Sequence, residues 1–175
     1  MLRIAFRALS PGEDAGAAAR GLLLELLVSA LGERRGGETF AALTKDENGR
    51  PFLAWDAPFV SFTHTKGLAA AAWSDSPVGI DAERLRPLTA RDRALLRRFF
   101  AGERGSVYAA RDQSGVAFFR FWTRREAAFK AFGTKPFYEE DPVPGHKTKT
   151  KTVEVNGDFY LLTVASDTDR LIFCP

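Results

Sequence analysis

The sequence predicts an α+β fold made of two similar α/β halves, residues 1–84 and residues 85–175. The main observation is the order of hydrophobic patterns, because a helical period followed by strand-like alternation occurs twice along the chain. The break is expected at residues 84–88, where strand-like alternation gives way to a helical period. No sequence repeat of fixed period relates the halves, so their similarity is expected in architecture alone.

The first half is predicted to open with a helix over residues 14–35, which Gly36 and Gly37 are expected to end. The helix is predicted from leucines that recur at helical spacing: Leu22, Leu23, Leu26, Leu27 and Leu31. The sequence Asn-Gly-Arg-Pro at residues 48–51 is typical of a turn. Short apolar runs then predict three strands with little chain between them: 59–65, 68–73 and 77–81.

The second half is predicted to open with a helix over residues 89–100, because Thr89 and Asp92 have the spacing of a capping box. Two further helices are expected, at 104–111 and at 116–132, the second ending at Gly133. The tail predicts a return to strands, with Asn156-Gly157 as a hairpin turn: 151–155, 159–166 and 170–174.

The composition is that of a globular protein, and it limits the cellular compartments and the classes of partner that can be expected. Of the 175 residues, 45% are hydrophobic, which is enough for a sizeable core, yet no apolar run approaches the roughly 20 residues that span a bilayer. There is one cysteine, Cys174, and no secretion signal is recognised, so a cytoplasmic protein is expected. The net charge of +3 favours acidic partners. Two halves within one chain suit a monomer.

Two carboxylates, Asp81 and Glu83, come at the end of the strand predicted at 77–81. Residues i and i+2 of a strand share a face, so both can be directed at one point. Adjacent carboxylates repel one another unless a cation lies between them or one of them takes up a proton. Oxygen ligands alone suit Mg²⁺ (or Mn²⁺). The alternative is that both acids are solvated at the surface.

A second acidic position lies in the helix predicted at 116–132, where Trp122, Glu126 and Lys130 follow one face at i, i+4 and i+8. Glu126 followed by Lys130 is also the favourable order for an ordinary surface ion pair, which is the alternative interpretation. Further upstream, five residues able to donate hydrogen bonds to phosphate lie around a predicted turn and strand end: Arg50, Thr63, His64, Thr65 and Lys66. A lone histidine is usually structural, so these residues alone do not decide between a phosphate-binding site and a structural role.

Four short motifs in this order resemble the Sfp-type 4′-phosphopantetheinyl transferases over about residues 40–133. They are Gly-Arg-Pro at 49–51, Thr-His-Thr at 63–65, Gly-Ile-Asp-Ala-Glu at 79–83, and the pattern from Phe118 through Trp122 to Gly133. The resemblance implies a fold with pseudo-twofold symmetry. It also implies transfer of 4′-phosphopantetheine from coenzyme A to a serine of an apo acyl or peptidyl carrier protein.

The resemblance also implies roles for individual residues. Asp81, Glu83 and Glu126 match the family's Mg²⁺ ligands, and Glu126 also matches the proposed general base. Lys130 matches a lysine that contacts phosphate. The positions that hold the 3′-phosphate of coenzyme A are matched by three residues: Arg50, Thr63 and His64.

The sequence departs from the family pattern in its amino-terminal part. The segment before the first helix is shorter than is usual in the family, so the nucleotide contacts of a longer basic segment cannot be transferred. Arg20 lies near an expected helix arginine, and other cations are candidates to substitute: Arg3, Arg34 and Arg35.

Two rival functions remain at this level: a non-catalytic homologue that binds coenzyme A or a carrier protein, and a basic nucleic-acid-binding protein. The second is suggested by the net charge and by Lys147, Lys149 and Lys151, although that alternation is more typical of an edge strand protected by lysines. A docking surface for an acidic carrier protein is predicted from the arginines after the 77–81 strand: Arg84, Arg86, Arg91, Arg93, Arg97 and Arg98.

Overall fold

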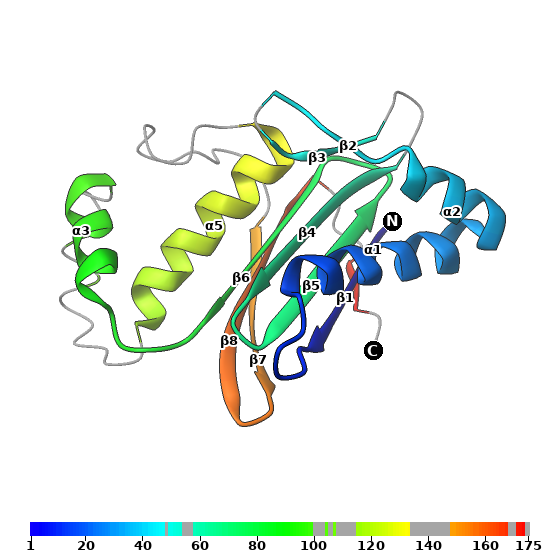
Figure 1. Ribbon diagram of the computed structural model, residues 1–175. Coiled ribbons are helices and arrows are strands. Elements are labelled where there is room, and N and C mark those ends of the chain that lie inside the picture. Colours follow the sequence, from blue (N-terminus) through cyan, green and yellow to red (C-terminus); the bar gives the residue numbers. More distant parts are fainter. Residues whose placement is uncertain are drawn as a thin grey trace.

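A computed structural model describes residues 1–47, 49–53, 58–99, 104, 107, 115–133, 148–167 and 171–173. The predicted mixture of helices and strands is confirmed (Figure 1). The helices are α1 (Ala15–Leu31), α2 (Glu33–Ala41), α3 (Ala90–Phe99) and α5 (Val116–Phe132). The strands are β1 (Leu2–Ala8), β2 (Thr44–Lys45), β3 (Pro51–Phe52), β4 (Phe59–Thr65), β5 (Leu68–Ser74), β6 (Val78–Arg84), β7 (Thr148–Val155), β8 (Asp158–Ser166) and β9 (Leu171–Phe173).

The strands form two main sheets and a short hairpin. The first sheet has the order β4-β5-β1-β9, the second has the order β6-β8-β7, and β2 pairs with β3. All neighbours are antiparallel except β1 and β9, which are parallel. The chain changes sheet between β5 and β6, and β9 returns to the first sheet. The change of sheet therefore does not coincide with the break expected at residues 84–88.

A hydrophobic core lies between the two sheets, and each sheet carries a helix on its other side. Alternate residues of β1, β5, β6 and β8 fill the space between the sheets, including Ile4, Ile80 and Leu162. The leucines of α1 pack on the first sheet, and α5 packs on the second through residues such as Ala127. Figure 1 shows α1 and α5 on opposite sides of the strands. None of the described helices is long and apolar enough to cross a membrane.

Several local signals are confirmed. The Thr89 amide donates to the Asp92 carboxylate at 2.7 Å, and the Asp92 amide donates to the Thr89 hydroxyl at 3.2 Å, which is the predicted capping box. Helix α5 has the predicted bounds and ends at Gly133, whose φ is +73°. Asn156 and Gly157 both have positive φ between β7 and β8, as a tight hairpin turn requires.

The single helix predicted at residues 14–35 is wrong, because the chain breaks at Gly32, whose φ is +82°, and a second helix follows. The predicted stop, Gly36, instead lies inside α2. A Cβ there would lie 2.6 Å from the backbone of Val28, so glycine is needed for α2 to pack closely against α1. Strand β1 was not anticipated. Most of the helix predicted at 104–111 lies outside the described residues, as do Lys147 and Cys174.

Candidate functional site

Asp81 lies on β6 in a buried position, with a side-chain exposure of 9%. Its Oδ1 atom accepts hydrogen bonds from Lys130 Nζ at 2.7 Å and from the Thr63 hydroxyl at 3.1 Å. Lys130 Nζ also donates to the carbonyl oxygen of Ile80 at 3.0 Å. The second carboxylate oxygen, Oδ2, is buried and has no hydrogen-bond partner among the described residues. A buried carboxylate oxygen without a partner is costly unless a cation or donor reaches it.

Helix α5 reaches Asp81 because β6 carries a glycine, Gly79, two residues before Asp81 and on the same face of the strand. A Cβ at Gly79 would overlap the carbonyl oxygen of Ala127 and would lie 2.6 Å from the amide nitrogen of Ala131. Only glycine allows the helix backbone to approach the strand this closely. The glycine of the Gly-Ile-Asp motif therefore determines how near Lys130 and Glu126 come to β6.

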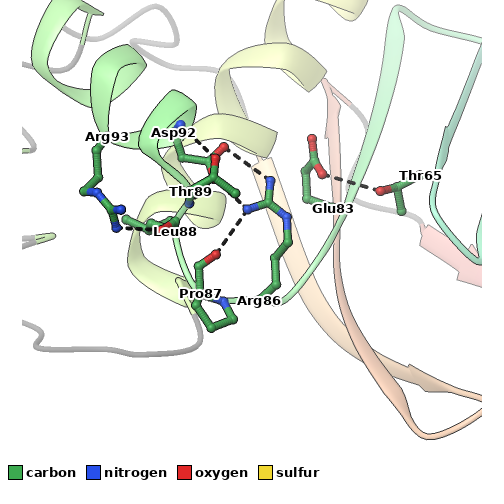
Figure 2. Close-up of polar contacts among 8 residues, drawn as sticks. All are labelled: Thr65, Glu83, Arg86, Pro87, Leu88, Thr89, Asp92 and Arg93. Atoms are coloured by element: carbon green, nitrogen blue, oxygen red, sulfur yellow. Dashed lines mark hydrogen bonds and ion pairs between the residues drawn. The ribbon is translucent and has the colours of Figure 1, made fainter.

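Glu83 and Glu126 are influenced by the same charge, that of Asp81. Burial, followed by repulsion from Asp81, raises the pKa of Glu83 to about 7. The same two causes raise the pKa of Glu126, while Lys130 lowers it by less. The Thr65 hydroxyl donates to Glu83 across a long distance of 3.5 Å (Figure 2). Asp81, Glu83 and Glu126 are called the acidic site below.

The acidic site suits an added cation, because Lys130 offsets only part of the negative charge of its three carboxylates. Within the described ranges no three ligand groups lie close enough together to hold one metal ion. However, Asp81 Oδ2 has no partner in the part of the chain that the structure describes, and the charged forms of Glu83 and Glu126 are disfavoured. A divalent cation would relieve both conditions, and carboxylate oxygens are ligands that Mg²⁺ prefers. The residues therefore fit the metal that the sequence motifs imply.

Strand β4 runs beside β6 and supplies hydroxyl groups to it. The Ser61 hydroxyl accepts from the Ile80 amide at 3.1 Å, and the Thr63 and Thr65 hydroxyls donate to Asp81 and Glu83. Thr63 was expected to contact phosphate, but the structure engages its hydroxyl with Asp81.

A cavity of about 400 Å³ lies on the other side of β4, and basic side chains from α1, β2, β4, α5 and the β2–β3 turn line it. His64 is exposed and lines this cavity, as strand alternation requires for a residue between Thr63 and Thr65. No described carboxylate lines it. The cavity is called the basic cavity below, and its basic lining residues are Arg20, Lys45, Arg50, His64 and Lys130.

The structure thus brings the predicted residues into two adjoining groups, with Lys130 shared between them. Sequence reasoning left Arg20 unassigned and missed Lys45. The position of Lys45 five residues before Arg50, on the opposite side of a predicted turn, was the available signal. Arg3, Arg34 and Arg35, which were considered as substitute cations, are not among the residues that line the basic cavity.

The predicted arginine surface is only partly available for a partner. Arg84 pairs with Asp158 at 2.5 Å. Arg86 pairs with Asp92 at 2.5 Å, as Figure 2 shows, and lies over the Phe119 ring at 4.9 Å. These two arginines fasten the 84–89 segment to β8, α3 and α5. The arginines of α3 that are exposed to solvent are Arg91, Arg93, Arg97 and Arg98.

Comparison with known proteins agrees with the geometry. Residues 77–165, about half of the chain, match the sequence model of the 4′-phosphopantetheinyl transferase superfamily. The chain is also 30% identical over 111 residues to a 4′-phosphopantetheinyl transferase, gsp, of Aneurinibacillus migulanus. That alignment covers 62% of this chain and 45% of the relative, so the chain spans less than half of the relative's length. The matched family segment contains the acidic site and Lys130. The chain belongs to the 4′-phosphopantetheinyl transferase superfamily.

Proposed function

We propose that this protein transfers the 4′-phosphopantetheine group of coenzyme A to a serine of an apo acyl or peptidyl carrier protein, with Mg²⁺ (or Mn²⁺) as cofactor. The serine hydroxyl would attack the β-phosphate of coenzyme A, the pyrophosphate bond would break, and adenosine 3′,5′-bisphosphate would leave. The observation that carries the proposal is the direct contact between the acidic site and the basic cavity through Lys130. An adjoining metal site and anion site suit a ligand that carries phosphate groups and binds a divalent cation, as a pyrophosphate does.

The proposed roles at the acidic site follow from its contacts. Asp81, Glu83 and Glu126 would hold the metal, which would stabilise the negative charge that develops on the pyrophosphate. Thr63 orients Asp81 through its hydroxyl, and Lys130 holds Asp81 and is also among the residues that line the basic cavity. Glu126 would accept the proton of the carrier serine, which is the role of general base that the resemblance implies for it.

The proposed roles at the basic cavity concern the nucleotide end of the coenzyme. His64 and Arg50 line the cavity, which supports the proposal that they bind the 3′-phosphate. Thr63 is not among the lining residues, so its proposed contribution to coenzyme binding is indirect. Arg20, which lies over the Phe40 ring at 5.3 Å, adds a cation that the sequence could not assign.

The remaining proposals concern assembly and partners. One helix packed on each main sheet, α1 on the first and α5 on the second, supports a pseudo-twofold relation between the two halves. The proposed enzyme is monomeric and cytoplasmic, as expected from the sequence. An acidic carrier protein would dock on the exposed arginines of α3, which follows the strand that carries Asp81 and Glu83.

The test is mass spectrometry of candidate apo carrier proteins incubated with this protein, coenzyme A and Mg²⁺. A serine-linked mass gain equal to phosphopantetheine, abolished by a chelator and restored by Mg²⁺, is the expected result. Tight binding of coenzyme A without any transfer to a panel of acyl and peptidyl carriers would favour a non-catalytic homologue instead. Binding to nucleic acid that falls steeply with salt and ignores coenzyme A would favour the nucleic-acid interpretation.

A further inference from the structure

Arg50 lies at the end of the turn between β2 and β3, and protein groups already engage its guanidinium. Its Nε donates to Asp46 Oδ2 at 2.6 Å, and its Nη1 donates to the carbonyl oxygen of Phe129 at 3.2 Å. Its backbone amide donates to Asp46 Oδ1 at 2.9 Å. Arg50 therefore connects the β2–β3 hairpin to the last turn of α5, and the carboxylate of Asp46 offsets much of its charge.

Lys45 lies beside Arg50 in space but differs from it in charge balance. It is on β2, and its pairing partner across the hairpin is Pro51, the residue after Arg50. Its side chain is exposed and lines the basic cavity. No ion pair joins it to a carboxylate of the described residues. Its ammonium charge is thus available to a ligand in the cavity.

The other lysine of the basic cavity is not available in the same way. Lys130 is held by Asp81 at 2.7 Å and by the carbonyl oxygen of Ile80 at 3.0 Å. A cation that keeps its full charge beside an anion attracts it more strongly than one already paired with a carboxylate. Of the two cations on the β2–β3 hairpin, Arg50 is likewise paired with a carboxylate, whereas Lys45 is open to the cavity.

We propose that Lys45 is the phosphate-binding cation of the β2–β3 hairpin and that it contacts the 3′-phosphate of coenzyme A. Arg50, assigned above to the same phosphate, then contributes mainly as a positioning residue, because Asp46 and Phe129 already engage its guanidinium. Arg50 fixes the hairpin, and with it Lys45, against the end of α5. This proposal rests on the proposed function in that it takes coenzyme A as the ligand of the basic cavity. It makes Lys45 a determinant of the preference for coenzyme A over its dephospho form.

The experiment is titration calorimetry of coenzyme A and dephospho-coenzyme A with the natural protein and with Lys45→Ala. The substitution should weaken coenzyme A about tenfold or more and dephospho-coenzyme A by less than about twofold, because one charged hydrogen bond to the 3′-phosphate is lost. Lys66→Ala is the matched control, because Lys66 is an exposed lysine in the β4–β5 turn that is not among the residues lining the cavity. It should leave both affinities unchanged.

Arg50→Lys separates positioning from contact. Lysine keeps the charge but cannot bridge Asp46 and Phe129 at once, so both coenzymes should weaken by similar factors and their ratio should persist. The assignment is overturned if Lys45→Ala leaves the ratio of the two coenzyme affinities unchanged, whether or not both affinities fall. A natural protein that binds neither coenzyme would overturn the proposed function itself.

Discussion

The acidic site and the basic cavity adjoin one another through Lys130 but treat charge in opposite ways. At the acidic site, Asp81 is buried and Glu83 and Glu126 are partly buried. One oxygen of Asp81 has no hydrogen-bond partner among the described residues, and the pKa of Glu83 is raised to about 7. In the basic cavity, cations line an open space that no described carboxylate lines. The acidic site has an excess of negative charge, and the basic cavity has an excess of positive charge. Together they suit a ligand that brings a divalent cation to one and phosphate groups to the other.

Strand β4 explains how two opposite environments can lie so close together. Successive side chains of a strand point to opposite faces, so Thr63 and Thr65 reach the carboxylates of β6 while His64 lines the basic cavity. The Thr-His-Thr motif thus serves both regions with three consecutive residues. The predictions below separate the two regions, beginning with the largest expected effect.

Gly79→Ala should damage the acidic site most, because the added methyl group would overlap the backbone of α5 at Ala127. We expect the free energy of unfolding to fall by about 3 kcal/mol and the melting temperature to fall by about 6–12 °C. Transfer activity should fall as well, since Glu126 and Lys130 move with the helix. Thermal denaturation and an activity assay measure these effects.

Gly21→Ala is the control for this change. Gly21 lies in α1, and a Cβ there meets nothing within 4 Å. Replacing an unconstrained helix glycine by alanine should stabilise the protein by about 0.5–1 kcal/mol. If Gly79→Ala were as stable and active as Gly21→Ala, close approach of α5 to β6 would not be required.

Asp81→Asn should remove activity while leaving the preference for coenzyme A over its dephospho form unchanged. We expect kcat/KM for transfer to fall about 100-fold or more, because the proposed metal site would lose its central charge. The ratio of affinities for coenzyme A and dephospho-coenzyme A, measured without metal, should stay unchanged. A variant that lost this ratio together with its activity would show that the two regions do not act independently.

Reversing exposed charges of α3 should weaken binding of the carrier protein and should leave the acidic site and the basic cavity unchanged. With Arg91→Glu and Arg97→Glu combined, KM for the carrier protein should rise about tenfold at low salt, because steering of an acidic partner is lost. KM for coenzyme A should not change, and the defect should shrink as salt is added. Arg34→Glu with Arg35→Glu reverses two exposed charges on α2 as a control. Equal defects in both double variants would place docking elsewhere, with exposed Lys149 and Lys151 of edge strand β7 as the next candidates.

The smallest expected effect is the pH dependence of stability that Glu83 confers. Its pKa of about 7 in the folded protein lies above its ordinary value of 4.5, so the folded state binds the proton more tightly. The contribution of Glu83 to stability is therefore present below pH 4.5 and is lost as the pH rises to about 7. The loss should be about 1 kcal/mol, since the side chain is only partly buried.

Denaturant titrations at pH 5 and pH 8, without metal, measure this dependence. Glu83→Gln should reduce the difference between the two values, and part of the difference should persist because the pKa of Glu126 is raised in the same sense. Added Mg²⁺ should stabilise the natural protein more at pH 8 than at pH 5. An unchanged pH slope in Glu83→Gln would contradict the electrostatic description of the acidic site.

The sequence by itself determined the features that depend on neighbouring residues. Strand alternation placed Thr63 and His64 on opposite faces, and the bounds of α5, the Thr89–Asp92 capping box and the Asn156-Gly157 turn follow from local signals. These could be predicted because propensity, spacing and backbone sterics act over a few residues. The superfamily motifs around Asp81 and Glu126 are of the same kind, since each is a short local pattern.

Tertiary structure alone decided which partners the site residues have. Lys130 and Asp81 are 49 residues apart, and Arg50 and Phe129 are 79 residues apart, so no local pattern states either contact. The same holds for Thr63, which was expected to bind phosphate and donates to Asp81 instead. Lys45 was missed because its local signal, a position across the predicted turn from Arg50, does not distinguish it from any other surface lysine. It becomes significant only where α1, β4 and α5 line the same cavity. Packing determines which of several capable side chains is already paired and which remains open to a ligand.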